Sequence, residues 1–255
     1  MNTDWVQQKR NAGLDYIDQY IAYKDLRKVW KSGSNNLFDF LQEHIVPLMK
    51  IMPHTEREAE YLIIMKDSLN RGAAWQLFDK KDFFKLCVMI KEFVDFRYLV
   101  NKHGSAEIGE GRILELGAGR GLLSCFMAME GAFPNHDLIA TNTDKRTEVE
   151  FVDHNETFAF VEQYDAVKAV TELGDKTSLF VVSWPREEYL KEVLPNILEL
   201  SKETPRYVLY IGQKEGRKCA GKESFKLLKM AEVLWEFELV GWPGDDAWAI
   251  LYCFD

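Results

Sequence analysis

One short run in the chain has residue types and a spacing suited to holding a small ligand against the backbone. An apolar stretch ends in an acid, Glu115, and three glycines follow at alternate positions, Gly117, Gly119 and Gly121. Glycine adopts positive φ freely and leaves room for a ligand beside the main chain. Apolar residues at helical spacing come next, so the glycines lead into a helix N-terminus with free N–H groups. The run predicts a buried strand, a glycine turn and a helix start that bind a ligand; an ordinary strand-to-helix turn is the alternative.

The position of the third glycine separates two kinds of cofactor site. A dinucleotide fingerprint, G-x-G-x-x-G, needs glycine at position 122, where this chain has leucine. The pattern E-x-G-x-G-x-G closely resembles the first motif of the class I S-adenosylmethionine-dependent methyltransferases. The resemblance implies that Glu115, Gly117, Ala118, Gly119 and Gly121 hold the methionine part of S-adenosylmethionine, the acid orienting its amino end. The product would be S-adenosylhomocysteine.

The second half of the chain alternates strand-like and helix-like segments. Strands are expected at 112–116, 137–141, 158–161, 178–183 and 206–211, and helices at 189–198 and through 227–235. Alternation of this kind predicts an α/β fold: a Rossmann-like, doubly wound, mostly parallel sheet with helices on both faces. Strand-like runs at 236–242 and 247–254 flank a turn of Pro, Gly and Asp, so an antiparallel C-terminal hairpin is expected. The resemblance implies a seven-stranded sheet whose reversed last strand is inserted beside the sixth.

The first hundred residues have a different, all-helical pattern. Apolar spacing predicts a helix over 14–30, a second with the stripe Leu37, Leu41, Ile45 and Leu48, and a third from residue 82 to 94. Asn36 is the expected cap of the second helix, and a glycine-rich stretch at 103–111 is the expected linker. We therefore expect a helical region at 1–107, serving as a lid, an acceptor pocket or a partner-binding element, and a methyltransferase-like domain at 108–255.

Ligands of doubly wound sheets bind at the carboxyl ends of the strands. The resemblance implies an acid after the second strand that binds the cofactor ribose. This chain has Asn142 at that position and Asp144 as the nearest acid. The resemblance further implies that Asp165 and Ala166 contact the adenine. Asn and Asp are also ordinary turn residues, which is the alternative for each of them.

The fourth strand ends in Ser183, Trp184, Pro185 and Arg186, the segment that faces the transferred methyl group in the resembled fold. Ser183 is expected beside the cofactor. The Trp-Pro pair would give the acceptor a stiff aromatic wall with backbone carbonyls turned toward it, and Arg186 would pair with a carboxylate or phosphate. Tyr189, one turn further on, would line the same pocket. The alternative for Trp184 is packing under the N-terminal helices.

Composition limits the other functional classes. The net charge of −9 gives no strong signal for nucleic acid or an anionic membrane, and no apolar run is long enough to span a bilayer. No secretory signal is present, so a cytoplasmic protein is expected. The four cysteines are widely spaced, which favours buried free thiols, and the five histidines have no metal-ligand spacing, so no metal is expected.

These observations predict an S-adenosylmethionine-dependent methyltransferase whose catalytic residues, acceptor and oligomeric state the sequence leaves open. A small-molecule or protein acceptor is favoured over nucleic acid because the chain is acidic. The alternative is a catalytically silent methyltransferase-like binding or scaffold protein, favoured by Asn142 and by the Trp-Pro-Arg sequence after Ser183.

Overall fold

The computed structural model describes residues 31–50, 76, 78–92, 111–129, 136–143, 157–214, 219–241 and 246–255. The helix expected at 14–30, the boundary expected between residues 107 and 108, and Asp144 lie outside these ranges. None of the described helices is long and apolar enough to cross a membrane. All four cysteines are buried and free, as the sequence predicts.

Seven strands in the described residues form a single sheet. They are β1 (Gly111–Leu116), β2 (His136–Asn142), β3 (Val161–Gln163), β4 (Thr177–Ser183), β5 (Arg206–Gln213), β6 (Glu232–Glu238) and β7 (Ala247–Phe254). Their order across the sheet is β3-β2-β1-β4-β5-β7-β6. Strands β1 to β5 pair in parallel, and β7 runs antiparallel to both β5 and β6. The doubly wound sheet and its reversed, inserted last strand are therefore confirmed.

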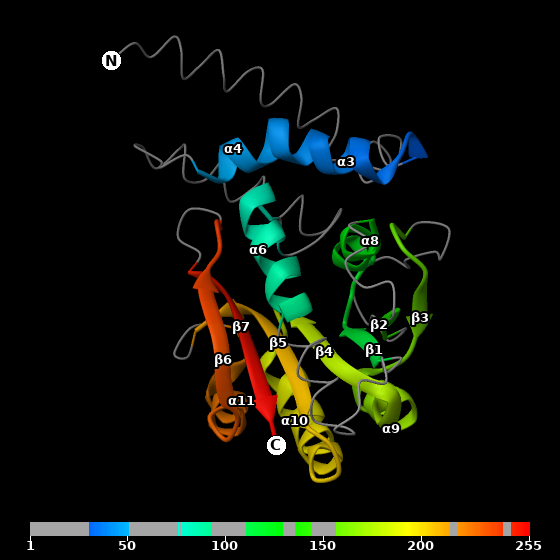
Figure 1. Ribbon diagram of the computed structural model, residues 1–255, viewed down its shortest axis with the longest axis vertical. Coiled ribbons are helices and arrows are strands. Elements are labelled where there is room, and N and C mark those ends of the chain that lie inside the picture. The colour runs from blue at the N-terminus through cyan, green and yellow to red at the C-terminus, as the bar shows by residue number, and fades with distance from the viewer. Residues whose placement is uncertain are drawn as a thin grey trace.

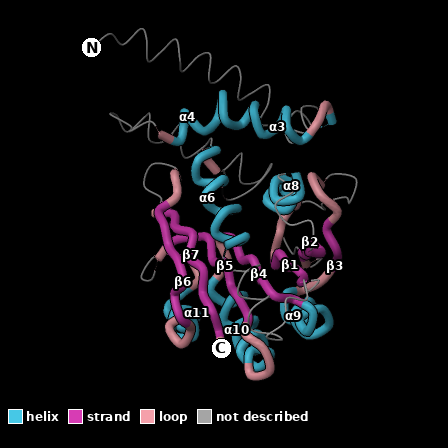
Figure 2. Tube along the Cα trace, in the orientation of Figure 1, coloured by secondary structure: helices cyan, strands magenta, loops and turns pink. Residues whose placement is uncertain are grey.

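Helices cover both faces of the sheet (Figure 1, Figure 2). One layer consists of α9 (Ala166–Leu173), α10 (Glu187–Ser201) and α11 (Gly221–Leu228), and the other contains α6 (Lys80–Ile90) and α8 (Leu122–Met129). Successive residues of a strand point to opposite faces. Accordingly, Phe180 and Val182 belong to the core under α9, α10 and α11, whereas Leu179 and Val181 belong to the core under α6 and α8.

The described N-terminal helices pack into the second of these cores. Helix α3 (Ser34–Phe40), a π-helical turn η1 (Leu41–Ile45) and α4 (Val46–Met49) follow one another along the top of Figure 1. Their stripe of Leu37, Leu41 and Ile45 is buried in one hydrophobic cluster with α8 and a face of the sheet. The ring of Phe38 meets that of Phe126, on α8, edge-on at a centroid distance of 5.1 Å.

The cap expected for this helix is wrong. The helix begins at Ser34, and Gly33, with φ of 132°, occupies the N-cap position. Asn36 already lies within the first turn, where its Nδ2 donates back to the Ser32 carbonyl at 2.8 Å. The asparagine therefore binds the preceding turn of chain instead of capping the helix that follows.

The bounds of several elements also differ from the sequence prediction. The edge strand expected at 158–161 is Val161–Gln163. Phe158 lies ahead of it, buried in the cluster with α8, and its N–H donates to the Arg120 carbonyl at 2.8 Å. In the sequence, the apolar Phe158 looks like part of a strand. In the structure it is buried because it packs beside the glycine turn.

The helix expected to reach residue 235 ends at Leu228, and the strand expected at 236–242 is β6, at 232–238. The pairing of β6 with β7 shifts register between Val233 and Trp235. Such an irregularity turns consecutive side chains toward one face, and Leu234 and Trp235 both pack against the same core cluster. Adjacent apolar residues of this kind imitate a helical stripe in the sequence.

Candidate functional site

The glycine run forms a tight turn between β1 and α8. Gly117, Gly119 and Gly121 have φ of 68°, 58° and 74°, in the left-handed region that favours glycine. The turn is fixed by backbone hydrogen bonds: the Ala118 N–H donates to the Thr141 carbonyl at 2.8 Å, and the Gly121 N–H to the Ala118 carbonyl at 2.9 Å. The predicted strand, glycine turn and helix start are confirmed.

The surroundings of the three glycines differ. A Cβ at Gly121 would lie 3.0 Å from Val161 Cγ2, so this glycine serves close packing against β3. A Cβ at Gly117 would lie 3.0 Å from the hydroxyl of Tyr189. A Cβ at Gly119 would meet no atom of the described residues within 4 Å. The backbone at Gly119 is therefore the part of the turn that is open to a ligand.

Glu115 is a buried carboxylate on the α8 side of β1. Its Oε2 accepts a hydrogen bond from the Ser124 backbone N–H at 3.1 Å and a second from the Ser124 hydroxyl. Burial raises the pKa of Glu115 to about 7, although the hydrogen bonds from Ser124 oppose that rise. Both bonds end on Oε2, so Oε1 takes no part in them. The role of Ser124 was not predicted, and its only sequence signal is a hydroxyl within an apolar helix.

The hydroxyl of Tyr189, the third residue of α10, lies against Gly117. It is buried and has no hydrogen-bond partner among the described residues. Burial is the main cause that raises the pKa of Tyr189, and the nearby carboxylates of Glu115 and Asp165 add to it. The phenol is therefore neutral and keeps its proton to donate.

Two further expected residues follow the ends of β2 and β3, and one of them, Asn142, reaches the glycine turn. Asn142, the last residue of β2, is half-buried, and its Nδ2 is 3.4 Å from the Gly119 carbonyl. Asp165 is the N-cap of α9, and its Oδ1 accepts from the Lys168 N–H at 2.9 Å. It therefore has the structural role that was its alternative interpretation. Ala166 follows it, buried in the α9 side of the core.

The segment after β4 is held by the protein itself. Trp184 has φ of 49°, a strained conformation for a tryptophan, and its N–H donates to the Ile211 carbonyl at 2.7 Å. The Pro185 carbonyl accepts from the Ala220 N–H at 3.0 Å, so this one carbonyl of the segment is bonded within the protein. Ser183 is half-buried, whereas Arg186, at the N-cap of α10, is exposed.

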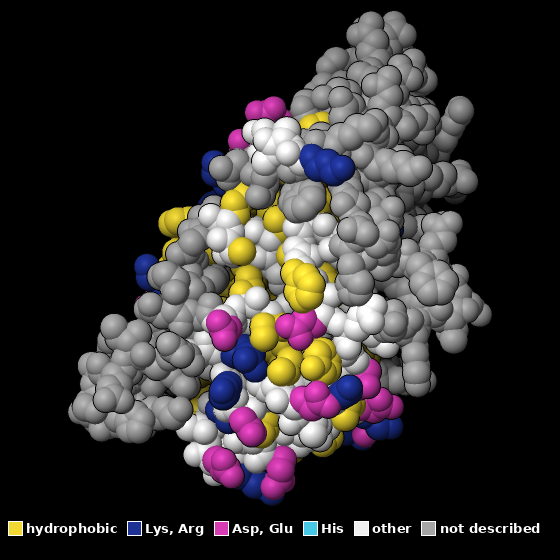
Figure 3. All heavy atoms as spheres, turned by 90° about the vertical axis from the view of Figure 1, so that its right-hand side faces the viewer, with side chains coloured by type: hydrophobic (Ala, Val, Ile, Leu, Met, Phe, Trp, Pro, Cys, Tyr) yellow, Lys and Arg dark blue, Asp and Glu magenta, His cyan; other side chains and the backbone are white. Residues whose placement is uncertain are grey.

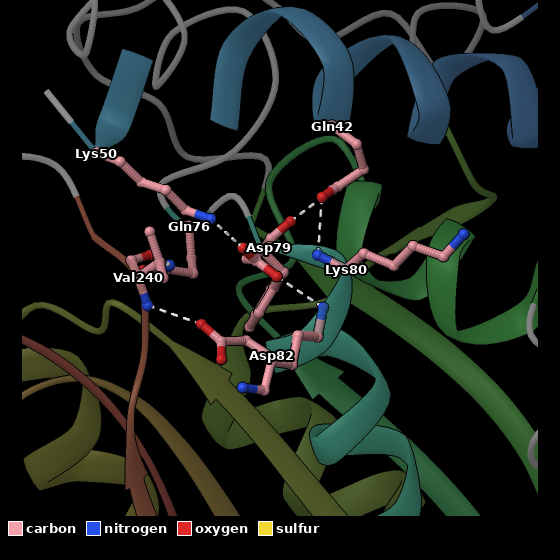
Figure 4. A network of polar contacts seen from close by, with 9 residues as sticks. Gln42, Lys50, Gln76, Asp79, Lys80, Asp82 and Val240 are labelled. Carbon is pink, nitrogen blue, oxygen red and sulfur yellow. Dashed lines mark hydrogen bonds and ion pairs between the residues drawn. The ribbon is translucent and has the colours of Figure 1, made fainter. Parts of the chain in front are cut away.

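The indole of Trp184 reaches the N-terminal region, as its alternative interpretation required. Its Nε1 donates to Gln76 Oε1 at 3.0 Å, and Gln76 Nε2 donates to the Val240 carbonyl at 3.2 Å. Asp82 of α6 accepts from the Val240 N–H at 2.8 Å (Figure 4). Buried Gln76 therefore joins the end of β4 to the chain after β6, and no sequence pattern indicated this role.

The same network fixes the start of α6 (Figure 4). Asp79 caps the helix by accepting from the Lys81 N–H at 2.7 Å, and its ion pair with Lys50 lowers its pKa. Gln42 accepts from the Lys80 N–H at 2.7 Å and donates to the Phe78 carbonyl at 2.7 Å. These contacts tie the π-helical turn and α4 to α6.

Side chains of both charges are interspersed on the described part of the face seen in Figure 3, and no basic tract forms there. Hydrophobic side chains also reach the surface in that view. Among the residues that the structure describes, no group of three or more His, Cys, Asp or Glu side chains lies together as a metal site.

The residues at the turn fit the amino-acid part of an S-adenosyl cofactor in three respects. Among the described residues the backbone at Gly119 is open and the hydroxyl of Tyr189 has no partner, and the buried carboxyl of Glu115 acts on that hydroxyl through its charge. The fit is less complete at the ribose, because an acid there would accept two hydrogen bonds where Asn142 offers one amide oxygen. Asp144, the other candidate, lies outside the described residues.

The strand order decides the fold. A sheet ordered β3-β2-β1-β4-β5-β7-β6, with only β7 reversed, has the topology expected from the first-motif resemblance. The fold is that of the class I methyltransferases. The glycine turn after β1 lies where the strand order changes direction, which is the usual ligand position in such sheets.

No model of a known protein family matches the sequence, and no curated protein matches it. Solved structures with a similar fold include magnesium protoporphyrin IX methyltransferase from Synechocystis PCC 6803 with bound SAM. That pair has 9% identity, coverage of 87% of this chain and 97% of the other, and a TM-score of 0.42. The METTL16 methyltransferase domain has 14% identity, coverage of 86% and 92%, and a TM-score of 0.42.

A third similar structure is a putative tRNA (m1A22) methyltransferase of Streptococcus pneumoniae, Sp1610, in complex with S-adenosyl-L-methionine. It has 14% identity, coverage of 67% of this chain and 72% of the other, and a TM-score of 0.40. Likenesses as weak as these three do not identify an activity or an acceptor for this chain.

Proposed function

We propose that the chain is an S-adenosylmethionine-dependent methyltransferase. The observation that carries the proposal is the glycine turn after β1, where Gly119 has positive φ and no atom of the described part of the chain lies within 4 Å of its Cβ position. A turn that served packing alone would have its glycines crowded, as Gly121 is. Open backbone at the switch point of a doubly wound sheet suits a ligand.

S-adenosylmethionine supplies a methyl group on a sulfonium, already activated for transfer. The chain then has to bind, orient and shield the reactants, which is the part of catalysis that proximity provides. Glu115 and Tyr189 offer a carboxyl and a hydroxyl for the amino-acid end, and the amide oxygen of Asn142 is an acceptor for a ribose hydroxyl. Asp165, with one oxygen in the α9 cap, retains the other for the adenine amine, and Ser183 borders the methyl group.

The acceptor is a small molecule or a protein, in keeping with the net charge of −9 and the interspersed charges in Figure 3. Arg186 is exposed at the start of α10, so it is available to a carboxylate or phosphate of the acceptor. In this proposal residues 1–107 form a region distinct from 108–255 and serve as a lid, an acceptor pocket or a partner-binding element.

A catalytically silent scaffold is the second candidate, favoured by the segment after β4. The indole of Trp184 and the carbonyl of Pro185 are both occupied by contacts within the protein. An acceptor wall built from these two groups has fewer free polar atoms than the sequence suggested. The enzyme must bind the cofactor, whereas a scaffold has no need to, so affinity for the cofactor is the first property to measure.

The experiment is calorimetric titration of the chain with S-adenosylhomocysteine, with NADH as the competing ligand class. Micromolar binding of S-adenosylhomocysteine alone is expected. Gly119→Arg should abolish it by filling the open backbone position, whereas Gly33→Arg, at another glycine with positive φ in the N-cap of α3, should leave it unchanged. No binding of either ligand to the unmodified chain would refute the enzyme and favour the scaffold.

A further inference from the structure

The hydroxyl of Tyr189 is an exception in a well-bonded interior. Buried polar side chains almost always have a hydrogen-bond partner, and a missing one calls for a reason. By contrast, the hydroxyl of Tyr210, on β5, donates to the Gln213 carbonyl at 2.6 Å. The Tyr189 hydroxyl is buried without a partner among the described residues and lies against Gly117. Phenylalanine would pack there without the penalty of an unpaired hydroxyl.

The charges of two carboxylates, Glu115 and Asp165, act on this hydroxyl, and that of Glu115 has the larger effect. A buried carboxylate attracts a cation, and the cationic part of an amino acid is its ammonium group. In an α-amino acid the carboxylate is attached to the same carbon as the ammonium. A hydrogen-bond donor on which the charge of Glu115 acts is therefore placed to meet that carboxylate when the ammonium is paired.

We infer that the Tyr189 hydroxyl donates a hydrogen bond to the α-carboxylate of the cofactor's amino-acid end while Glu115 pairs with the ammonium. The inference rests on the proposed function, and it moves Tyr189 from the acceptor wall, where the sequence placed it, to the cofactor. Burial and the nearby carboxylates raise the pKa of Tyr189, so the phenol keeps the proton that it donates. The partner that the free protein lacks is thus supplied by the ligand.

The test compares two ligands that differ only at the amino-acid end. S-adenosylhomocysteine carries the ammonium and the carboxylate, and 5′-methylthioadenosine lacks both. Tyr189→Phe should weaken binding of S-adenosylhomocysteine about 10-fold, as expected for one hydrogen bond to a charged group, and leave 5′-methylthioadenosine binding unchanged. The matched control is Tyr210→Phe, which removes a buried hydroxyl that is bonded within the fold.

Thermal unfolding without ligand gives a second readout. Tyr189→Phe should raise the unfolding temperature, because it removes an unpaired buried hydroxyl. Tyr210→Phe should lower the unfolding temperature and leave the affinity for S-adenosylhomocysteine unchanged. A structural hydroxyl at Tyr189 would produce the opposite: a lower unfolding temperature and equal effects on both ligands.

The possible outcomes distinguish failure of the inference from failure of the proposed function on which it rests. If the unmodified chain binds neither ligand, the proposed function fails and the inference fails with it. If it binds both, and Tyr189→Phe binds S-adenosylhomocysteine as tightly as before, only the inference is overturned. Equal weakening of both ligands, or a lower unfolding temperature for Tyr189→Phe, overturns the inference as well and leaves the function in place.

Discussion

The buried carboxyl of Glu115 should make the stability of the protein fall as the pH rises. Burial raises its pKa from the usual value of 4.5 to about 7, so between these values the folded chain holds a proton that the unfolded chain has released. Stability then decreases with pH. A difference of one between the folded and unfolded pKa values corresponds to about 1.4 kcal/mol. The full effect is therefore about 3 kcal/mol, of which about 2.5 kcal/mol is lost between about pH 5 and about pH 8.

Glu115→Gln isolates this contribution. The amide cannot titrate, and its oxygen can still accept the hydrogen bonds from Ser124. Reversible urea unfolding of both proteins across this pH range gives two free energies of unfolding at each pH. Their difference, variant minus unmodified chain, should grow by about 2.5 kcal/mol from about pH 5 to about pH 8, in favour of the variant. Other titrating groups cancel in the difference.

The matched control is Glu172→Gln, at an exposed glutamate on α9 that pairs with Lys168. It reports the effect of exchanging a surface carboxylate for an amide. A difference for Glu115→Gln that stays constant with pH would refute the reasoning, because the Glu115 carboxyl would then titrate alike in the folded and unfolded chains. A difference of the opposite sign would mean that the native structure favours the carboxylate.

Four further substitutions test other contacts, each by chemical denaturation. Gly121→Ala should lower the free energy of unfolding by about 2 to 3 kcal/mol, since its Cβ would crowd β3. Gly119→Ala, with no described atom near its Cβ position, should lower it by about 1 kcal/mol from positive φ alone. Equal losses would contradict the packing role of Gly121. Asp165→Ala should lose about 1 kcal/mol with the α9 cap, and no loss would mean that α9 begins without it. Gln76→Ala should lose about 1 to 3 kcal/mol by removing the side-chain oxygen that accepts from the Trp184 indole N–H. An unchanged stability would show that water replaces the amide.

Much of the fold was predictable because its signals are local. Buried strands such as β4 and β5 are nearly continuous apolar runs. The glycine turn has three residues with positive φ, a conformation that strongly favours glycine. The prediction failed where tertiary contacts imitate another local pattern. Adjacent Leu234 and Trp235 resemble a helical face in the sequence, but the register shift in β6 turns them both to one core.

Only the part of the site formed by Glu115 and the glycine turn was predictable from the sequence. Glu115 and the glycines are contiguous in sequence, so one motif reveals them all. Gln76 is 108 residues from its partner Trp184, and nothing local to either marks the pair. Likewise, the sequence around Asp165 suits a ligand or a cap equally, and only the position of the Lys168 N–H shows that it caps α9.

The place of β7 in the sheet has a consequence for synthesis on the ribosome. β6 leaves the ribosome before β7, yet among the described strands its only neighbour is β7. Until β7 arrives, β5 also has a bare edge, since β7 is the strand that covers it. Unpaired edges are templates for aggregation. A nascent chain paused between β6 and β7 is therefore the form most in need of a chaperone.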